Sequence, residues 1–214
     1  MAVYDLEEQE QIAEIKAWWN RYGNLVVSAL LVVTLGFAGW SGWNRYQNAQ
    51  AVEAGALYFE LQQAVAAGNT QRVRELAGTL ISNYGGTLQA QLGAMLSGGL
   101  QFRMNDSTNA RPQLEWATKE GKDPALRDLA RLRLATVLLN EKEMDAALAC
   151  LQPMPEGPWR VRFEDLRGDA LAAQGKAAEA RAAWRAAVEA LDKGDGGTGS
   201  LRDLIRDKLE SLEG

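Results

Sequence analysis

The sequence contains no histidine and only one cysteine, Cys150, among its 214 residues. Without histidine the chain cannot form a Ser-His or Cys-His nucleophile pair, and metal sites that require an imidazole are excluded. A single cysteine cannot form an intrachain disulfide, which is compatible with either a reducing or an oxidising compartment. Cys150 lies in the apolar stripe of an expected helix with nothing nearby to favour its thiolate, so we interpret it as a buried structural thiol. The sequence points away from an enzyme, and we expect no catalytic residue, metal or cofactor.

An excess of positive charge is also missing. The net charge is −5, of which residues 1–22 contribute −3 (five acidic against two basic side chains) and the remainder −2. A nearly neutral domain has no general attraction for phosphate backbones, so we expect no nucleic-acid partner. The roughly 170 residues after the first 44 are enough for one domain with a sizeable core.

Charge is absent altogether from the 23 residues between Arg21 and Arg45. At about 1.5 Å per residue, a helix of this length exceeds the roughly 30 Å of a bilayer's hydrocarbon core. Aromatic residues, several with polar ring groups that favour the headgroup levels, flank both ends of the run: Trp18, Trp19, Tyr22, Trp40, Trp43 and Tyr46. We therefore predict a single transmembrane helix at residues 24–43.

Two other interpretations of this run are weaker. A buried helix of a soluble domain would rarely contain so many uncharged residues in succession. A cleaved signal peptide is suggested by the small residues Ala49 and Ala51, but the run exceeds the roughly 7–15 apolar residues of a signal core, and Arg45 separates it from that site. The preceding residues are also acidic rather than basic. We expect an uncleaved anchor.

The basic residues near the anchor give its orientation. Lys16 and Arg21 precede it, whereas Arg45 alone follows it before Arg72, which favours a cytoplasmic N-terminus. Residues 1–23 would then be an acidic cytoplasmic segment, with a short amphipathic helix at 6–22, and residues 44–214 would lie across the membrane.

Glycine recurs every three residues inside the predicted span, at Gly36, Gly39 and Gly42. Small residues allow another transmembrane helix to approach closely, so Gly36 and Gly39 are candidate partner-binding positions. The alternative is that glycine is simply tolerated there.

Beyond Arg45 the sequence is rich in helix formers, and helix-breaking turns recur near positions 68, 106, 141 and 175. A period near 34 residues with a turn at each step indicates paired-helix repeats. We predict an all-α solenoid of about four helix pairs with a C-terminal capping helix over 200–213, started by Ser200. The pairs are 47–66 with 70–83, 88–104 with 108–119, 124–139 with 142–152, and 160–173 with 177–192.

The last pair follows the tetratricopeptide pattern most closely, through Gly168, Gly175, Ala180, Trp184 and Ala187. Small residues let the two helices of a hairpin touch, and a large aromatic fills the space before the next element. We therefore expect Trp184 in the core. The alternative for the tryptophans of the repeats is a platform for binding a peptide: Trp116, Trp159 and Trp184.

Two further patterns lack a functional context. Gly194, Gly196 and Gly199 match G-x-G-x-x-G, but a helix precedes them where a dinucleotide site needs a strand. Asp165 and Asp169 lie one helical turn apart, yet the neighbouring arginines favour a solvated charged face over a carboxylate pair that acts in catalysis.

The ordered set of motifs resembles a known family. An acidic N-terminus leads into Ile15-Lys16-x-Trp18-Trp19-x-x-Tyr22-Gly23, one span ends in Gly39-Trp40, and Gly157-Pro158-Trp159 precedes Asp165-x-Arg167-Gly168-Asp169-Ala170-Leu171 in the last pair. This combination is similar to the YfgM family, ancillary subunits of the bacterial SecYEG translocon. The resemblance implies a single-pass protein of the bacterial inner membrane with periplasmic repeats. It also implies as partners SecYEG, the membrane-anchored periplasmic chaperone PpiD and unfolded secreted chains that are handed onward.

The resemblance supplies no catalytic residue, and we expect a non-enzymatic adaptor or chaperone cofactor. An anchored repeat scaffold in another envelope complex, for division or outer-membrane assembly, is the alternative. Tetratricopeptide domains commonly bind peptides through the first helix of each pair. On this register the candidate partner-binding residues are Asp128, Arg131, Leu132, Arg162, Asp165 and Asp169.

Overall fold

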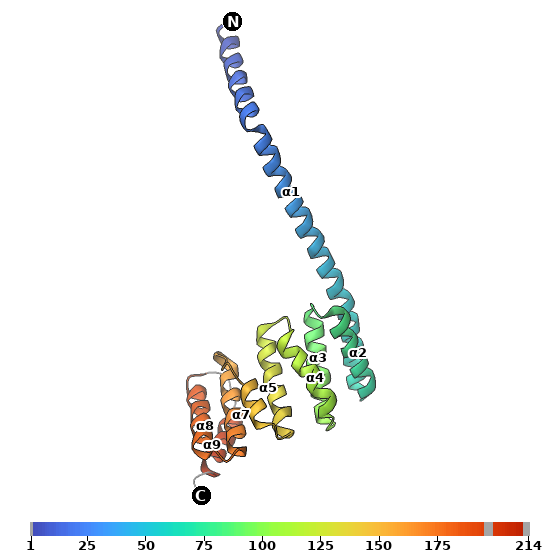
Figure 1. Ribbon diagram of the computed structural model, residues 1–214, viewed down its shortest axis with the longest axis vertical. Helices are drawn as coiled ribbons and strands as arrows, with labels where there is room; N and C mark the ends of the chain where they lie inside the picture. The colour runs from blue at the N-terminus through green and yellow to red at the C-terminus, as the bar shows by residue number, and fades with distance from the viewer. Residues whose placement is uncertain (1, 195–198, 212–214) are drawn as a thin grey trace. The chain divides into compact units, whose positions relative to one another are not determined.

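The computed structural model describes residues 2–194 and 199–211, with side chains described from residue 11 onward. All regular structure in these residues is helical, and none of them forms a strand (Figure 1). The chain divides into two units, residues 1–49 and residues 50–214. The expected all-α class is confirmed. The glycine-containing segment at 195–198 and the expected last residue of the capping helix, Glu213, lie outside the described residues.

Helix α1 (Ala2–Ala66) contains the whole of the predicted span without interruption. Residues 6–22 are helical as expected, but the expected short helix is wrong in its end, because the same helix continues through Tyr22 and Gly23. No proline occurs before Pro112, so no proline interrupts this stretch of the helix. The Trp19 ring covers Gly23, one helical turn further on, and packs there on the continuous helix.

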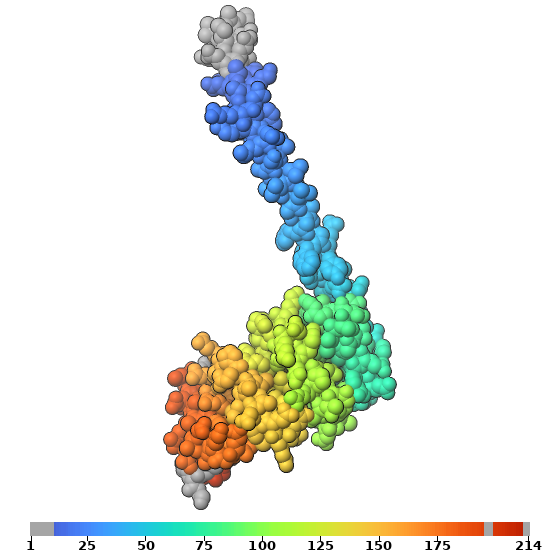
Figure 2. All heavy atoms as spheres, in the orientation of Figure 1, coloured from blue at the N-terminus to red at the C-terminus, as the bar shows by residue number. Residues whose placement is uncertain are grey.

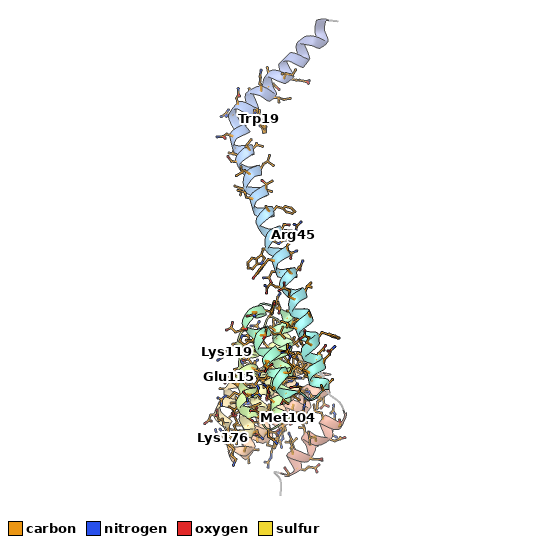
Figure 3. All side chains as sticks on the ribbon, turned by 90° about the vertical axis from the view of Figure 1, so that its right-hand side faces the viewer. Trp19, Arg45, Met104, Glu115, Lys119 and Lys176 are labelled. Atoms are coloured by element: carbon orange, nitrogen blue, oxygen red, sulfur yellow. The ribbon has the colours of Figure 1, made fainter. Side chains whose placement is uncertain are left out.

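The apolar stretch of α1 is exposed on all sides within its own unit. A segment in residues 11–66 is long and apolar enough to cross a membrane, and none of its most apolar part is buried. Leu30, Val32 and Phe37 are each at least 60% exposed, and side chains project around the helix between the labelled Trp19 and Arg45 (Figure 3). The buried-helix interpretation is therefore wrong. A continuous apolar surface of this size requires lipid or another protein as its cover.

The second unit is a stack of antiparallel helix pairs. The end of α1 pairs with α2 (Thr70–Tyr84), α3 (Leu88–Arg103) with α4 (Ser107–Lys119), α5 (Pro124–Asn140) with α6 (Met144–Cys150), and α7 (Arg160–Ala173) with α8 (Ala177–Asp192). A 3₁₀ turn, η1 (Gly157–Trp159), precedes α7, and α9 (Gly199–Ser211) packs on α8. The first helices also touch one another, α3 with α5 and α5 with α7. In the space-filling view the colours from α2 to α8 run in chain order, so each pair lies beside the next (Figure 2).

The hairpin turns explain the period of the sequence. Each contains one residue in the left-handed region: Gly68 at φ 68°, Asn105 at 58°, Lys142 at 62° and Gly175 at 76°. This conformation ends a helix and reverses the chain, and glycine or asparagine adopts it at least cost. Polar side chains then begin several of the following helices by accepting a backbone N–H three residues on: Asn69, Thr87, Asp106 and Asp123.

Two helix boundaries differ from the expected ones. Helix α6 covers seven residues rather than 142–152, because Pro153 and Pro155 follow it closely and proline cannot donate to a helical ladder. Helix α9 begins at Gly199, so Ser200 lies inside the helix and is not its first flanking residue.

The last pair is held together by close packing of Trp184 against Gly168. Trp184 is 4% exposed, and its indole Nε1 donates to the carbonyl of Asp165 at 3.1 Å. A Cβ added at Gly168 would lie 2.3 Å from that nitrogen, so only glycine fits. On the other side, Trp184 belongs to an apolar cluster with Ile205 of α9. The expectation that Trp184 is a core residue is confirmed.

We expect Gly168→Ala to lower the free energy of unfolding by about 1–3 kcal/mol, because the added methyl group overpacks the Trp184 ring. Gly78→Ala is the matched control, since Gly78 lies in α2 and a Cβ there would have no neighbour within 4 Å. That change should stabilise by about 0.5–1 kcal/mol, because alanine is the better helix former. Thermal unfolding of the full chain in detergent measures both variants. Equal melting of the two would contradict the close contact at Gly168.

Candidate functional site

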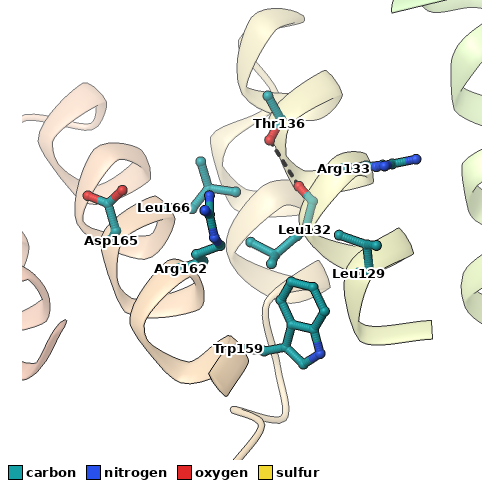
Figure 4. A pocket seen from close by; sticks show the side chains of 8 residues that line it. All are labelled: Leu129, Leu132, Arg133, Thr136, Trp159, Arg162, Asp165 and Leu166. Atoms are coloured by element: carbon teal, nitrogen blue, oxygen red, sulfur yellow. Dashed lines mark hydrogen bonds between the residues drawn. The ribbon is translucent and has the colours of Figure 1, made fainter. Parts of the chain in front are cut away.

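A cavity of about 450 Å³ lies between α5 and α7, the first helices of two successive pairs. Residues three or four apart on a helix share one face, and this spacing brings together the lining side chains of α5 and α7, while Trp159 is contributed by η1. They are Leu129, Leu132, Arg133, Thr136, Trp159, Arg162, Asp165 and Leu166 (Figure 4). The arrangement provides an apolar surface with charged groups at its edges, which suits an extended polypeptide segment.

Side-chain direction divides this cavity into a centre and two edges. Trp159, Leu132 and Leu166 occupy the space between the helices, and Arg162 lies among them (Figure 4). Asp165 points outward from α7, away from α5, and Arg133 points outward from α5 in the opposite direction. The centre is therefore apolar with one guanidinium.

A second cavity of about 210 Å³ adjoins the first on the α3 side. It shares Arg133 and Thr136 with the first cavity and adds residues of α3, α4 and α5: Gly99, Phe102, Arg103, Leu114 and Val137. We call the two adjoining cavities the first-helix groove, because α3, α5 and α7 supply most of their lining.

Arg133 stands where the two cavities meet. Its Nη1 donates to the carbonyl of Met95 at 2.9 Å. Burial lowers the pKa of the Arg133 guanidinium, and the neighbouring positive charge of Arg103 lowers it further. Two like charges thus lie close together at this point of the groove.

The predicted candidates do not form one site. Leu132, Arg162 and Asp165 line the groove together. Asp128 and Arg131 lie elsewhere on α5, beside a separate cavity of about 520 Å³ that also includes Cys150 and Pro153. Asp169 lies one turn beyond Asp165 on α7 and is not among the lining residues of either groove cavity.

Arg131 is engaged inside the fold. Its Nε donates to the carbonyl of Cys150 at 3.0 Å, its Nη2 to that of Pro153 at 2.6 Å and its Nη1 to the Asp128 carboxylate at 2.7 Å. The guanidinium also lies 4.9 Å from the centre of the Phe163 ring. With its side chain only 14% exposed, Arg131 binds the carbonyl end of the short helix α6 and has little capacity left for a partner.

Cys150 is half-buried beside Arg131, and its thiol donates to the carbonyl of Arg131 at 3.5 Å. Burial raises the pKa of the Cys150 thiol above its usual value. A raised pKa keeps the sulfur protonated, which agrees with a structural thiol rather than a nucleophile.

Asp165 and Asp169 both bind Lys208 of the capping helix. The Lys208 ammonium donates to Asp165 Oδ1 at 2.7 Å and to Asp169 Oδ2 at 2.8 Å, and lies 5.8 Å from the centre of the Trp184 ring. The side chains of Asp165 and Asp169 are 15% and 35% exposed. The expected solvated charged face is wrong for these two residues, because α9 covers them.

This cluster has shifted pKa values. Burial alone would lower the pKa of Lys208, but the hydrogen bonds and charges of Asp165 and Asp169 outweigh it, so the pKa is raised. Burial raises the pKa of Asp169 against the opposing effect of Lys208. Lys208 therefore contributes stability below the ordinary lysine pKa, and this contribution is lost as the pH rises through its higher folded value.

Several lining residues were not among the sequence candidates. Leu129 and Thr136 lie three residues before and four residues after Leu132, and Arg133 lies four residues after Leu129, so helical spacing could have identified all three. The sequence suggested for Trp159 either core packing or a platform for binding a peptide. In the structure it is half-buried and lines the groove. Arg103 and Phe102 carry no signal in the sequence, because their place depends on how α3 packs beside α5.

The described residues contain no cluster of three or more His, Cys, Asp or Glu side chains that could hold a metal ion. The stack of antiparallel helix pairs, with a groove on the first helices, is the architecture of a tetratricopeptide protein. Residues 16–214 match the model of a family described as tetratricopeptide repeat-like domain, and the chain belongs to this family.

Within that class, relatives that match this chain over nearly its whole length are named ancillary SecYEG translocon subunit. One from Neisseria gonorrhoeae is 27% identical over 209 residues, covering 97% of this chain and 98% of the relative. One from Escherichia coli is 27% identical over 215 residues, covering 99% of each. A third, from Aggregatibacter actinomycetemcomitans, is 26% identical over 214 residues and carries the same name. The resemblance to the YfgM family is thereby confirmed.

We expect Lys208→Met to lower the free energy of unfolding at pH 8 by about 1–2 kcal/mol, because it leaves two part-buried carboxylates without their cation. This loss in the free energy of unfolding is smaller than for a fully buried ion pair, because both carboxylates retain contact with water. The difference from wild type should shrink above about pH 10.4, because the unfolded chain then releases the Lys208 proton while the folded chain keeps it up to its higher pKa. Thermal unfolding across pH 8–11 measures it.

Arg202→Met is the control for this prediction, because Arg202 also lies on α9 and pairs with the exposed Asp192. An exposed pair contributes no more than about 1 kcal/mol, so this variant should melt close to wild type. Equal effects of the two substitutions would contradict a stabilising role for the Lys208 cluster.

Proposed function

We propose that this protein is a non-enzymatic, membrane-anchored adaptor and chaperone cofactor of the SecYEG translocon. The observation that carries the proposal is the combination of an unburied apolar helix and a grooved repeat stack in one chain. Relatives that match this sequence over nearly their whole length are named ancillary SecYEG translocon subunits. In this role the span keeps the repeats beside the translocon, and the repeats bind polypeptides or chaperones there.

The proposed orientation places residues 1–23 in the cytoplasm and residues 44–214 in the periplasm. Lys16 and Arg21 on the N-terminal side support it, since basic residues are retained in the cytoplasm. This orientation gives the groove access to chains emerging from the translocon and to the chaperone PpiD, and the protein would assist their handover.

The proposed partner-binding face of the span contains Gly36 and Gly39. A Cβ built at either residue meets no atom within 4 Å, so neither glycine is needed for packing inside this chain. Close approach of a partner helix is the role that small residues commonly have within a bilayer. We infer that a transmembrane helix of SecYEG or of PpiD packs there.

Protease added to intact spheroplasts should degrade the repeats and leave residues 1–22 protected. The expected product is a small membrane-bound fragment that an antibody against an N-terminal tag detects. Permeabilised cells provide the control in which both sides are cut. Repeats that survive in intact spheroplasts would overturn the proposed orientation.

Replacing Gly36 and Gly39 with leucine should leave membrane insertion intact, because leucine inserts more favourably than glycine. Copurification with SecYEG or with PpiD from detergent extracts should fall, since the larger side chains prevent close approach. Leu30→Ile and Val32→Ile, elsewhere in the span, are the control. Full recovery of both partners would remove the glycines from the interface, and recovery of a division or outer-membrane assembly complex instead would support the alternative scaffold.

A further inference from the structure

The first-helix groove has an unusual balance of charge. Each of three successive first helices contributes one exposed arginine: Arg103 on α3, Arg133 on α5 and Arg162 on α7. Among the lining residues the only acidic side chain is Asp165, and Lys208 already binds its carboxylate. The groove therefore presents three guanidinium groups and no free carboxylate.

These arginines have little to bind within the described part of the chain. Among the described residues, no hydrogen bond or ion pair involves the side chains of Arg103 and Arg162, and the Arg133 side chain donates to one backbone carbonyl. By contrast, Arg111 on α4 lies within 3.0 Å of the carboxylates of Glu115, Glu141 and Glu143. The guanidinium groups of the groove remain able to form charge-assisted hydrogen bonds with an external anion.

The remainder of the groove is apolar. Phe102, Leu114 and Val137 line the cavity on the α3 side, and Leu132, Trp159 and Leu166 line the one on the α7 side. A small inorganic anion would leave these surfaces unused, whereas a polypeptide can place apolar side chains on them and carboxylates on the arginines. The near-neutral charge of the repeats also argues against a polyanion such as nucleic acid.

The repeat spacing sets the spacing of the ligand. Packed helices lie about 8–10 Å apart, which is the lateral step across the groove from the helix of one of these arginines to the next. In the polyproline II conformation an extended chain advances about 3.1 Å per residue with three residues per turn, so residues three positions apart lie about 9 Å apart on the same side. The matching ligand has acidic residues three positions apart with apolar residues between them.

We propose that the first-helix groove binds an extended acidic-apolar peptide segment, with Arg133 at its centre and Arg103 and Arg162 on either side. The inference deepens the proposed adaptor function and rests on it for the view that the groove takes a polypeptide. It defines the class of client or chaperone segment that the repeats select.

The test uses the purified full chain in detergent micelles and two fluorescein-labelled peptides. One peptide contains two glutamates separated by two leucines and flanked by phenylalanine, and the other has glutamine at both glutamate positions. Fluorescence polarisation should show about tenfold tighter binding of the glutamate peptide, since two ion pairs in a part-exposed groove contribute about that factor. The preference should decline as the salt concentration rises.

Arg103→Gln combined with Arg162→Gln should weaken the preference, since Arg133 alone remains to pair with a glutamate. The melting temperature should not change, because neither side chain has a hydrogen-bond or ion-pair partner among the described residues. Arg185→Gln is the matched control, since Arg185 is an exposed arginine on α8, outside the groove. Equal binding of the two peptides by wild type, or an undiminished preference in the double variant, would overturn the proposal.

An anionic lipid headgroup is the competing occupant. A headgroup site would bind glycerol phosphate and show no preference between the two peptides, and this result would also overturn the proposal. The measurement uses purified protein and synthetic peptides, so a negative result would not bear on whether the protein associates with SecYEG. Loss of that association would in turn be detected in copurification and not in peptide binding.

Discussion

The structure depends on the burial of one helix pair by the next. A single hairpin of two short helices cannot cover its own apolar surface, so each pair uses its neighbour to do so. The contact between the third and fourth pairs illustrates this, because Leu134 and Leu138 of α5 share a buried cluster with Phe163 of α7. The same stacking sets α3, α5 and α7 side by side, and the groove is a direct result of that alignment.

The helix pairs could be predicted from the sequence because their turns are chemically distinct. Gly68 and Gly175 mark turns that need a left-handed residue, and the Asn105 turn was found to within one residue. Lengths were harder to predict: α6 ends early because of prolines beyond it, and α1 continues past Tyr22 because nothing stops it. Local chemistry therefore predicts where a helix must turn better than how far it extends.

The candidate site was predicted less completely, because the contacts that occupy its side chains join residues far apart in the sequence. Arg131 was a candidate because of its helical face, but its acceptors at Cys150 and Pro153 are 19 and 22 residues away. Asp165 is held by Lys208, 43 residues further on. A single sequence shows which residues share a face, whereas it does not show which of them the fold has already paired.

The binding of α6 by Arg131 has a consequence for how this repeat array can change in length. Arrays of this kind grow or shrink most simply when whole helix pairs are duplicated or deleted. Here the third helix pair is not interchangeable with the others. Arg131 binds the end of the short second helix of this pair and also contacts the Phe163 ring of the next pair. A regular helix pair inserted between the third and fourth would separate the Arg131 guanidinium from the Phe163 ring, so we expect these two pairs to be duplicated or deleted together.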